Sequence, residues 1–97
     1  MKITKHTFIK AISEVMSTEP VLELFDSDKD AFDQFSGFSY LLFIKIDGKD
    51  VTKSVYFDAV AQLVTELLPD NPSIASFVRI LSLIMFTSQI WDRLGKN

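Results

Sequence analysis

The sequence predicts a mainly α-helical protein, a small helical bundle formed by a single globular domain over residues 1–97. Along most of the chain, apolar residues recur every three or four positions, which is the period of an amphipathic helix. The composition is 47% hydrophobic and 24% charged, and 97 residues are enough to form a core without disulfides or metal. The absence of cysteine excludes disulfides and thiolate metal sites. The predicted helices lie at about 4–17, 19–25, 28–36, 55–68 and 73–94.

The first two helices are indicated by apolar spacing and by residues typical of helix starts. In the first, Phe8, Ile12 and Val15 share one side, and Thr4 precedes them as a capping residue. In the second, Pro20 stands in the first turn, where its missing N–H needs no partner. We therefore expect a break between the two near position 18.

The third helix has a signal at each end. Ser27, followed three residues later by Asp30, resembles a capping box, and Gly37 is typical of a helix end. Acidic residues in its first turn are favoured by the helix dipole. We therefore begin this helix at 28 and end it at 36.

The segment after Gly37 allows two interpretations. The run FSYLLFIKI at 38–46 is rich in aromatic and branched residues and precedes Asp47-Gly48, which favours a β-hairpin over about 38–55. The alternative is a buried helix, because periodicity alone does not assign a short apolar run. The first interpretation adds a hairpin to the bundle, and the second makes the protein all-α.

The last two helices carry most of the predicted core. The helix at 55–68 has one apolar stripe and ends before Pro69, while the helix at 73–94 is apolar on more than one side. A helix of the second kind lies at the centre of a bundle, or its uncovered side contacts a second copy in a homodimer through 73–94, with Ile90 and Trp91 at the contact. The residues expected to be buried are Leu63, Leu67, Phe77, Leu81, Ile84 and Met85.

Residue types that perform catalysis are scarce. His6 is the one histidine, and we expect it on the polar side of the first helix. The three glycines are too far apart to form a phosphate-binding loop, and a sequence pI near 4.9 disfavours direct nucleic-acid binding. We expect no cofactor, no metal and no enzymatic activity, with a hydrolase that uses carboxylates as the remaining enzymatic alternative.

One segment resembles part of a calcium loop. Asp26, Asp28 and Asp30 copy its first, third and fifth positions, but Ala31 and Gly37 stand where the loop needs glycine and glutamate. We therefore interpret this segment as an acidic helix start.

Acidic residues are concentrated in one fifth of the chain. Residues 14–33 hold seven acidic side chains against one basic side chain, a net charge of −6, whereas the whole chain carries −3. Such a field can steer a basic partner surface, or it can keep an apolar protein soluble.

These observations predict a small acidic protein-interaction module of the inhibitor, immunity or adaptor type. An alternative is an acidic nucleic-acid mimic that inhibits a nucleic-acid-processing enzyme. No secretory or membrane-spanning run is predicted, so we expect a cytoplasmic protein that binds another protein and contacts neither a membrane nor nucleic acid directly. The predicted partner-binding residues are Glu23, Phe25, Asp26, Asp28, Asp30, Phe32 and Asp33.

Overall fold

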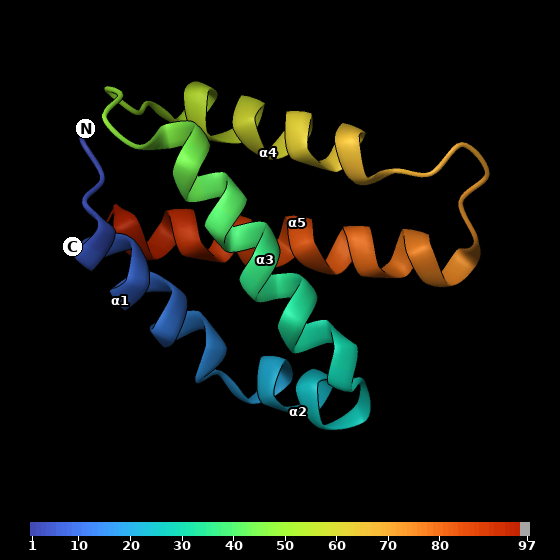
Figure 1. Cartoon of the computed structure of the whole chain (residues 1–97). Helices are drawn as coiled ribbons and strands as arrows, with labels where there is room; N and C mark the ends of the chain where they lie inside the picture. Colours follow the sequence, from blue (N-terminus) through green and yellow to red (C-terminus); the bar gives the residue numbers. More distant parts are fainter. Residues whose placement is uncertain (96–97) are drawn as a thin grey trace.

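The structure, a computed structural model, describes residues 1–95, and these residues form five α-helices and no strand. The mainly α-helical class is confirmed, in its all-α form. The helices, in chain order, are α1 (Lys5–Met16), α2 (Glu19–Ser27), α3 (Lys29–Ile46), α4 (Lys53–Leu67) and α5 (Ile74–Leu94) (Figure 1).

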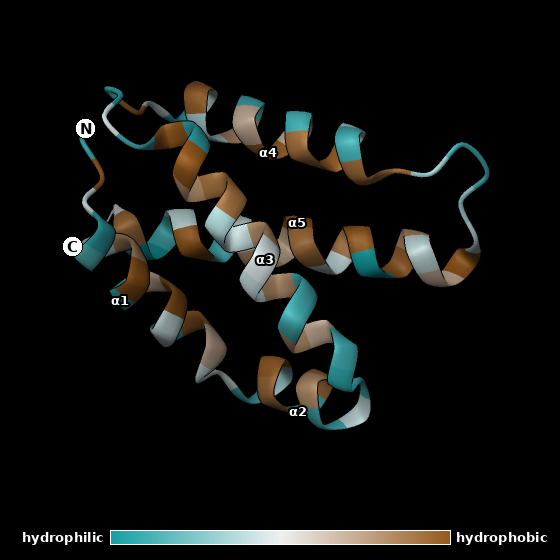
Figure 2. Ribbon diagram, in the orientation of Figure 1, coloured by the Kyte–Doolittle hydropathy of each residue, from teal (hydrophilic) through white to brown (hydrophobic). Residues whose placement is uncertain are grey.

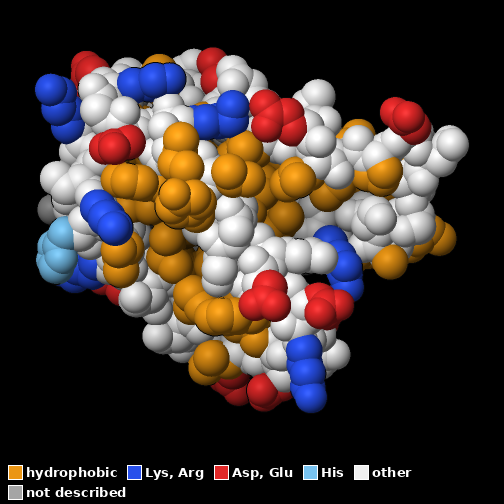
Figure 3. All heavy atoms as spheres, in the orientation of Figure 1, with side chains coloured by type: hydrophobic (Ala, Val, Ile, Leu, Met, Phe, Trp, Pro, Cys, Tyr) orange, Lys and Arg blue, Asp and Glu red, His pale blue; other side chains and the backbone are white. Residues whose placement is uncertain are grey.

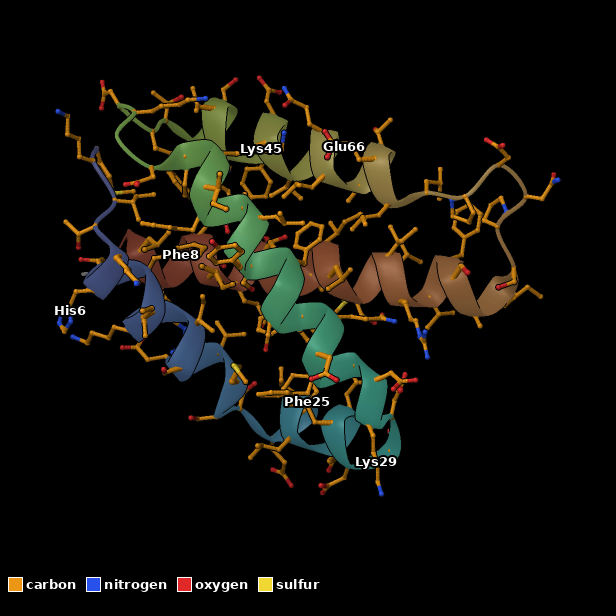
Figure 4. All side chains as sticks on the ribbon, in the orientation of Figure 1. His6, Phe8, Phe25, Lys29, Lys45 and Glu66 are labelled. Carbon is orange, nitrogen blue, oxygen red and sulfur yellow. The ribbon has the colours of Figure 1, made fainter. Side chains whose placement is uncertain are left out.

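The helices are arranged in a flat molecule. α4 and α5 run antiparallel, α3 crosses in front of α5, and α1 packs against α5 on the side away from α4 (Figure 1). On the surface, Lys45 of α3 lies 3.5 Å from Glu66 of α4 (Figure 4). The Cα atoms span 36 × 31 × 16 Å, so the thin dimension holds about two layers of helices. In such an arrangement, a helix can be covered on one side and exposed on the other.

Side-chain caps begin the first and last helices. Thr4 Oγ1 accepts a hydrogen bond from the Thr7 N–H at 3.1 Å, and Ser73 Oγ accepts one from the Ser76 N–H at 3.1 Å. Each cap satisfies one of the N–H groups that have no partner within the helix.

Residues 38–46 are helical, so both the hairpin over 38–55 and the helix end at 36 are wrong. Phe38, Leu42 and Ile46 are buried at helical spacing, whereas Tyr40 and Ile44 are 66% and 54% exposed. A strand would place all five side chains on the same side. Burial on one side of a helix accounts for the pattern, and the aromatic and branched residues reflect that burial.

Gly48, which favoured the hairpin, and Gly37, which favoured a helix end, have other roles. The Asp47 N–H donates to the Phe43 carbonyl at 2.8 Å, and Gly48 follows with φ of 77°, a left-handed conformation that ends α3. Gly37 lies in the middle of α3, which continues through it, and a side chain added there would meet no atom within 4 Å. The Asp-Gly pair therefore closes a helix instead of joining two strands.

The core lies between the inward sides of the helices, and α5 contributes one side to it. Of the six residues expected in the core, Leu63 is buried and Ile84 is half-buried. The expectation is wrong for Leu67, Phe77, Leu81 and Met85, which are 49–58% exposed. The physical reason is the flat arrangement, because α5 lies at a surface and not at the centre. The side chains of α5 that are buried are Ile80, Leu83, Phe86, Thr87, Ile90 and Leu94. The expectation that Ile90 contacts a second copy is therefore wrong, and Trp91 is half-buried against the core.

Within residues 1–95, α5 is also the one helix long and apolar enough to cross a membrane by length and composition. Its most apolar window has a mean hydropathy of 1.5, and 22% of that window is buried. Its inner side chains, among them Leu83 and Ile90, belong to the core. Insertion of α5 into a bilayer would therefore remove a wall of the core.

Candidate functional site

The acidic segment folds into a corner where α2 ends and α3 begins. We call residues 19–33 the acidic corner; it lies at the end of the molecule away from both termini (Figure 1). Six of the seven acidic residues of the segment belong to it. The seventh, Glu14, lies on α1, with its carboxylate 3.8 Å from the Arg93 guanidinium. Figure 2 shows the hydrophilic residues of the first turns of α3 beside α2.

Asp28 forms the junction of the corner. Its backbone N–H donates to the Leu24 carbonyl at 2.9 Å, and its side chain accepts from the Asp30 N–H at 3.1 Å, so one residue ends α2 and caps α3. Its second carboxylate oxygen lies 3.4 Å from the Arg79 guanidinium. The expectation that Ser27 caps α3 is wrong, because the Ser27 hydroxyl donates back to the Leu24 carbonyl at 3.1 Å.

The other five acidic side chains of the corner point to solvent. All of them are exposed, and none forms an ion pair with another residue between positions 1 and 95. Lys29, the one basic residue of the corner, lies at its outer end (Figure 4). The corner therefore keeps a net negative charge, although Lys29 lies within it and Arg79 lies beside Asp28. These five residues are Glu19, Glu23, Asp26, Asp30 and Asp33.

Apolar side chains lie among these carboxylates. Leu22 is 51% exposed and Phe32 is 46% exposed, while Phe25 is half-buried between α2 and α3 (Figure 4). Sequence reasoning missed Leu22, although its position next to Glu23 and four residues before Asp26 places it on the same side of α2. An exposed apolar group framed by charges is a common feature of protein-binding surfaces.

A chain of aromatic rings anchors the corner to the core. The Phe32 and Phe25 rings meet edge to face with centroids 5.5 Å apart, and the Phe25 and Phe35 centroids are 6.1 Å apart. Phe35 in turn meets Phe86 of α5 edge to face, at 5.1 Å. Such pairs add to the stabilisation from apolar burial and fix the relative orientation of the rings. The exposed ring of Phe32 is therefore held in place by its contact with Phe25, which packs against the core residue Phe35.

The structure brings all seven predicted partner-binding residues into this corner, in three different roles. Glu23, Asp26, Asp30 and Asp33 present charge, and Phe32 presents apolar area. The other two are structural: Phe25 supports the Phe32 ring, and Asp28 caps α3. That these residues contact a partner stays a prediction.

The three aspartates that resemble a calcium loop do not form a metal site. Asp26 lies on α2, Asp28 at the junction and Asp30 in the first turn of α3. Across the part of the chain that the structure describes, no group of three or more His, Cys, Asp or Glu side chains could hold a metal ion.

A groove of about 460 Å³ lies between α3, α4 and α5. Arg79 is the one charged side chain that lines it, among apolar neighbours such as Phe38, Leu41 and Ile80. A hydrolase that uses carboxylates needs two acidic groups with different environments at the reacting bond, and this groove presents none. It therefore offers no support for the hydrolase alternative.

A second exposed apolar surface lies on the face that α3 crosses (Figure 3). Its large exposed members are Ile9 of α1 and Tyr40, Leu41 and Ile44 of α3. Among them are hydroxyl groups and the half-buried Lys45, so this surface is mixed in character.

Comparison with protein-family models, with curated proteins and with solved structures finds no match to this chain. A proposal of function therefore rests on the geometry and charge of the acidic corner.

Proposed function

We propose that this protein is a non-catalytic interaction module that binds a basic surface of another protein through the acidic corner. One observation carries the proposal. Five exposed carboxylates without ion pairs within residues 1–95 share the corner with two half-exposed apolar side chains, Leu22 and Phe32, and packed rings support Phe32. We expect the protein to act in the cytoplasm as an inhibitor, immunity protein or adaptor.

The two kinds of side chain contribute differently to binding. Exposed charges accelerate the encounter with an oppositely charged surface and set its orientation, but they add little affinity once salt screens them. Apolar groups that become fully buried in a partner's pocket supply most of the affinity. The corner combines both, with Phe32 as the expected anchor and Glu23, Asp26 and Asp33 as steering charges.

The experiment is capture of partners from host lysate with the tagged protein and a charge-reversed variant carrying Glu23→Lys, Asp26→Lys and Asp33→Lys. None of these three side chains caps a helix or forms an ion pair within residues 1–95. Asp26 lies in the last turn of α2, where a lysine is favoured by the helix dipole. The variant should therefore fold, which its circular dichroism and unfolding midpoint will verify.

A second variant controls for net charge. It carries Asp47→Lys, Asp58→Lys and Asp70→Lys, three exposed positions outside the corner with no ion pair among the described residues. Both variants change the net charge of the chain by the same amount. A partner that the wild type and this control retain, and that the corner variant loses, supports the proposal. A partner retained equally by all three contradicts it.

The alternative function, a nucleic-acid mimic, would use the same acidic corner. In that case, the basic surface of the partner is its own nucleic-acid site, so free nucleic acid should release the captured partner in proportion to its concentration. A partner that nucleic acid does not release leaves the general protein-interaction module as the function.

A further inference from the structure

The outer side of α5 is apolar and exposed over three turns of helix. Ile74 is 85% exposed, and four further large side chains are between 49% and 58% exposed. They lie on the side of the helix opposite Leu83 and Ile90, which face the core. We call these residues the α5 stripe: Ile74, Phe77, Val78, Leu81 and Met85.

The stripe is large for a surface that stays in water. The exposed fractions correspond to about 600 Å² of apolar surface, the upper end of the largest patch that a monomeric protein usually shows. Two copies that covered the stripe on each other completely would bury at most about 1,200 Å² in total, the lower limit of specific, stable interfaces. The stripe can therefore supply an interface at the small end of the range of specific, stable contacts.

The spacing of the stripe fits pairing with itself. Large apolar residues at positions 74, 78, 81 and 85 follow intervals of four, three and four, as at a seam between two helices. This pattern reads the same in both directions about a midpoint between 79 and 80. In an antiparallel pair related by a two-fold axis, Ile74 then meets Met85 of the other copy, and Val78 meets Leu81.

We propose that the protein forms a homodimer through the α5 stripe, with the two α5 helices antiparallel about a two-fold axis near position 79. A two-fold contact requires a patch that is complementary to itself, and the stripe meets this requirement.

The charged residues of α5 favour a second copy of the chain, and not a membrane, as the partner of the α5 stripe. Helices that lie on membranes carry Lys and Arg beside the apolar side, to meet anionic headgroups. In α5, the basic residues are Arg79, directed to Asp28, and Arg93, directed to Glu14, and the chain as a whole carries −3. No charged side chain lies within the stripe itself, so two copies can meet without opposing like charges.

The dimer is independent of the proposed function. Arg79, which contacts the acidic corner, lies on a different side of α5 from the stripe, beside Ile80 and Leu83 in the wall of the groove. Val78 of the stripe lines a small pocket together with Leu24 and Asp28 of the corner, so the two surfaces adjoin. Pairing through the stripe nevertheless uses none of the five exposed carboxylates of the corner, and neither Leu22 nor Phe32. A failure of the dimer leaves corner binding intact, and a failure of corner binding leaves the dimer intact.

The first experiment measures molar mass by light scattering over a wide range of protein concentration. The wild type should approach twice the chain mass of 11.0 kDa at high concentration. Leu81→Gln should weaken the dimer by about tenfold or more, because a symmetric contact is lost twice. Ile44→Gln is the matched control, since Ile44 and Leu81 are exposed to nearly the same extent on different helices, and this variant should dimerise as the wild type does.

The second experiment tests the orientation with cysteines, which the native chain lacks. One protein carries Ile74→Cys and another Met85→Cys. Mild oxidation of the mixture should give the mixed disulfide as the main product, whereas each protein alone should stay monomeric on a non-reducing gel. In the antiparallel pair, two residues 74 are about 16 Å apart along the helix, too far for a disulfide.

Three results would overturn the proposal. The first is a monomer mass at all concentrations for the wild type. The second is equal dimerisation of the wild type and Leu81→Gln, which moves the contact off the stripe. The third is a 74–74 disulfide, which requires parallel helices. Sedimentation with phosphatidylcholine and phosphatidylglycerol vesicles completes the test, because a monomer that binds them through Leu81 assigns the stripe to a lipid surface.

Discussion

The guanidinium of Arg79 lies 3.4 Å from the carboxylate of Asp28, and this ion pair joins the second turn of α5 to the junction between α2 and α3. The same carboxylate accepts a hydrogen bond from the Asp30 N–H at 3.1 Å. Asp28 therefore has a structural role, whereas its acidic neighbours in the corner are exposed. The two contacts of Asp28 can be separated by mutation, because asparagine retains the cap and loses the charge.

Asp28→Asn should lower the free energy of unfolding by less than about 1 kcal/mol, since half-exposed ion pairs contribute little. Asp28→Ala should cost about 1 kcal/mol more, because the N-cap of α3 is lost as well. Urea unfolding of the two variants measures the difference. If both variants lose the same stability, the cap contributes nothing and the ion pair is the important contact.

Leu81 and Leu83 differ by two positions and should differ strongly in their effect on stability. Leu83 is 8% exposed and lies in the core, whereas Leu81 is 57% exposed. Leu83→Ala should cost about 2–5 kcal/mol, and Leu81→Ala less than about 1 kcal/mol in dilute monomer. Chemical denaturation at low protein concentration measures both. Equal losses would show that α5 is covered on its outer side.

Substitutions of Phe32 and Phe35 should separate partner binding from folding. Phe35 is 1% exposed and contacts Phe86, so Phe35→Ala should cost about 3–5 kcal/mol of stability. Phe32→Ala removes a half-exposed ring and one edge-to-face pair, which should cost about 1 kcal/mol. The captured partner should nevertheless dissociate faster from Phe32→Ala than from the wild type, as surface plasmon resonance can show. An unchanged dissociation rate would remove Phe32 from the interface.

Tyr56 should make stability depend on pH in the alkaline range. Its hydroxyl is buried and donates to the Thr87 carbonyl at 2.6 Å, and burial, with a smaller effect of Asp92, raises the pKa of Tyr56 well above its ordinary value. A tyrosine in the unfolded chain titrates near pH 10, so the stability from the neutral hydroxyl is complete below about pH 10 and is lost at higher pH.

Tyr56→Phe tests this dependence. At pH 7 the variant should be about 1 kcal/mol less stable than the wild type, because the buried hydrogen bond is lost. This difference should narrow as the pH rises above about 10, which urea unfolding at several pH values measures. Tyr40→Phe, a change at an exposed side chain, is the control. A difference that stays constant with pH would show that Tyr56 ionises equally easily in both states.

Local signals in the sequence predict four of the five helices to within a few residues, because capping residues such as Thr4 and Ser73 act within a single turn. The prediction for residues 38–46 is wrong for a physical reason. Their aromatic and branched side chains suit a buried strand and a buried helix equally, and the choice depends on the helices that pack against them. The wrong prediction that α5 is buried on all sides has the same cause, since the composition of a helix does not show which side its neighbours cover.

Charge counting located the acidic corner, because charge is a property of the sequence itself. The structural role of Asp28 could not be predicted in this way, since it depends on Arg79, which is 51 residues away in the chain. The exposure of Leu22 depends likewise on how α2 rests on α3. The sequence therefore predicts where the negative charge lies, whereas the role of each side chain in the corner depends on three-dimensional contacts.

The most direct test of the proposed function is the association rate of the captured partner, measured by stopped flow at low and at physiological salt. The wild type and the control with Asp47, Asp58 and Asp70 changed to Lys should associate fast at low salt and several-fold more slowly at physiological salt. The variant with Glu23, Asp26 and Asp33 changed to Lys should associate slowly at both. Equal association rates for all three proteins at both salt concentrations would contradict a function of the acidic corner in binding.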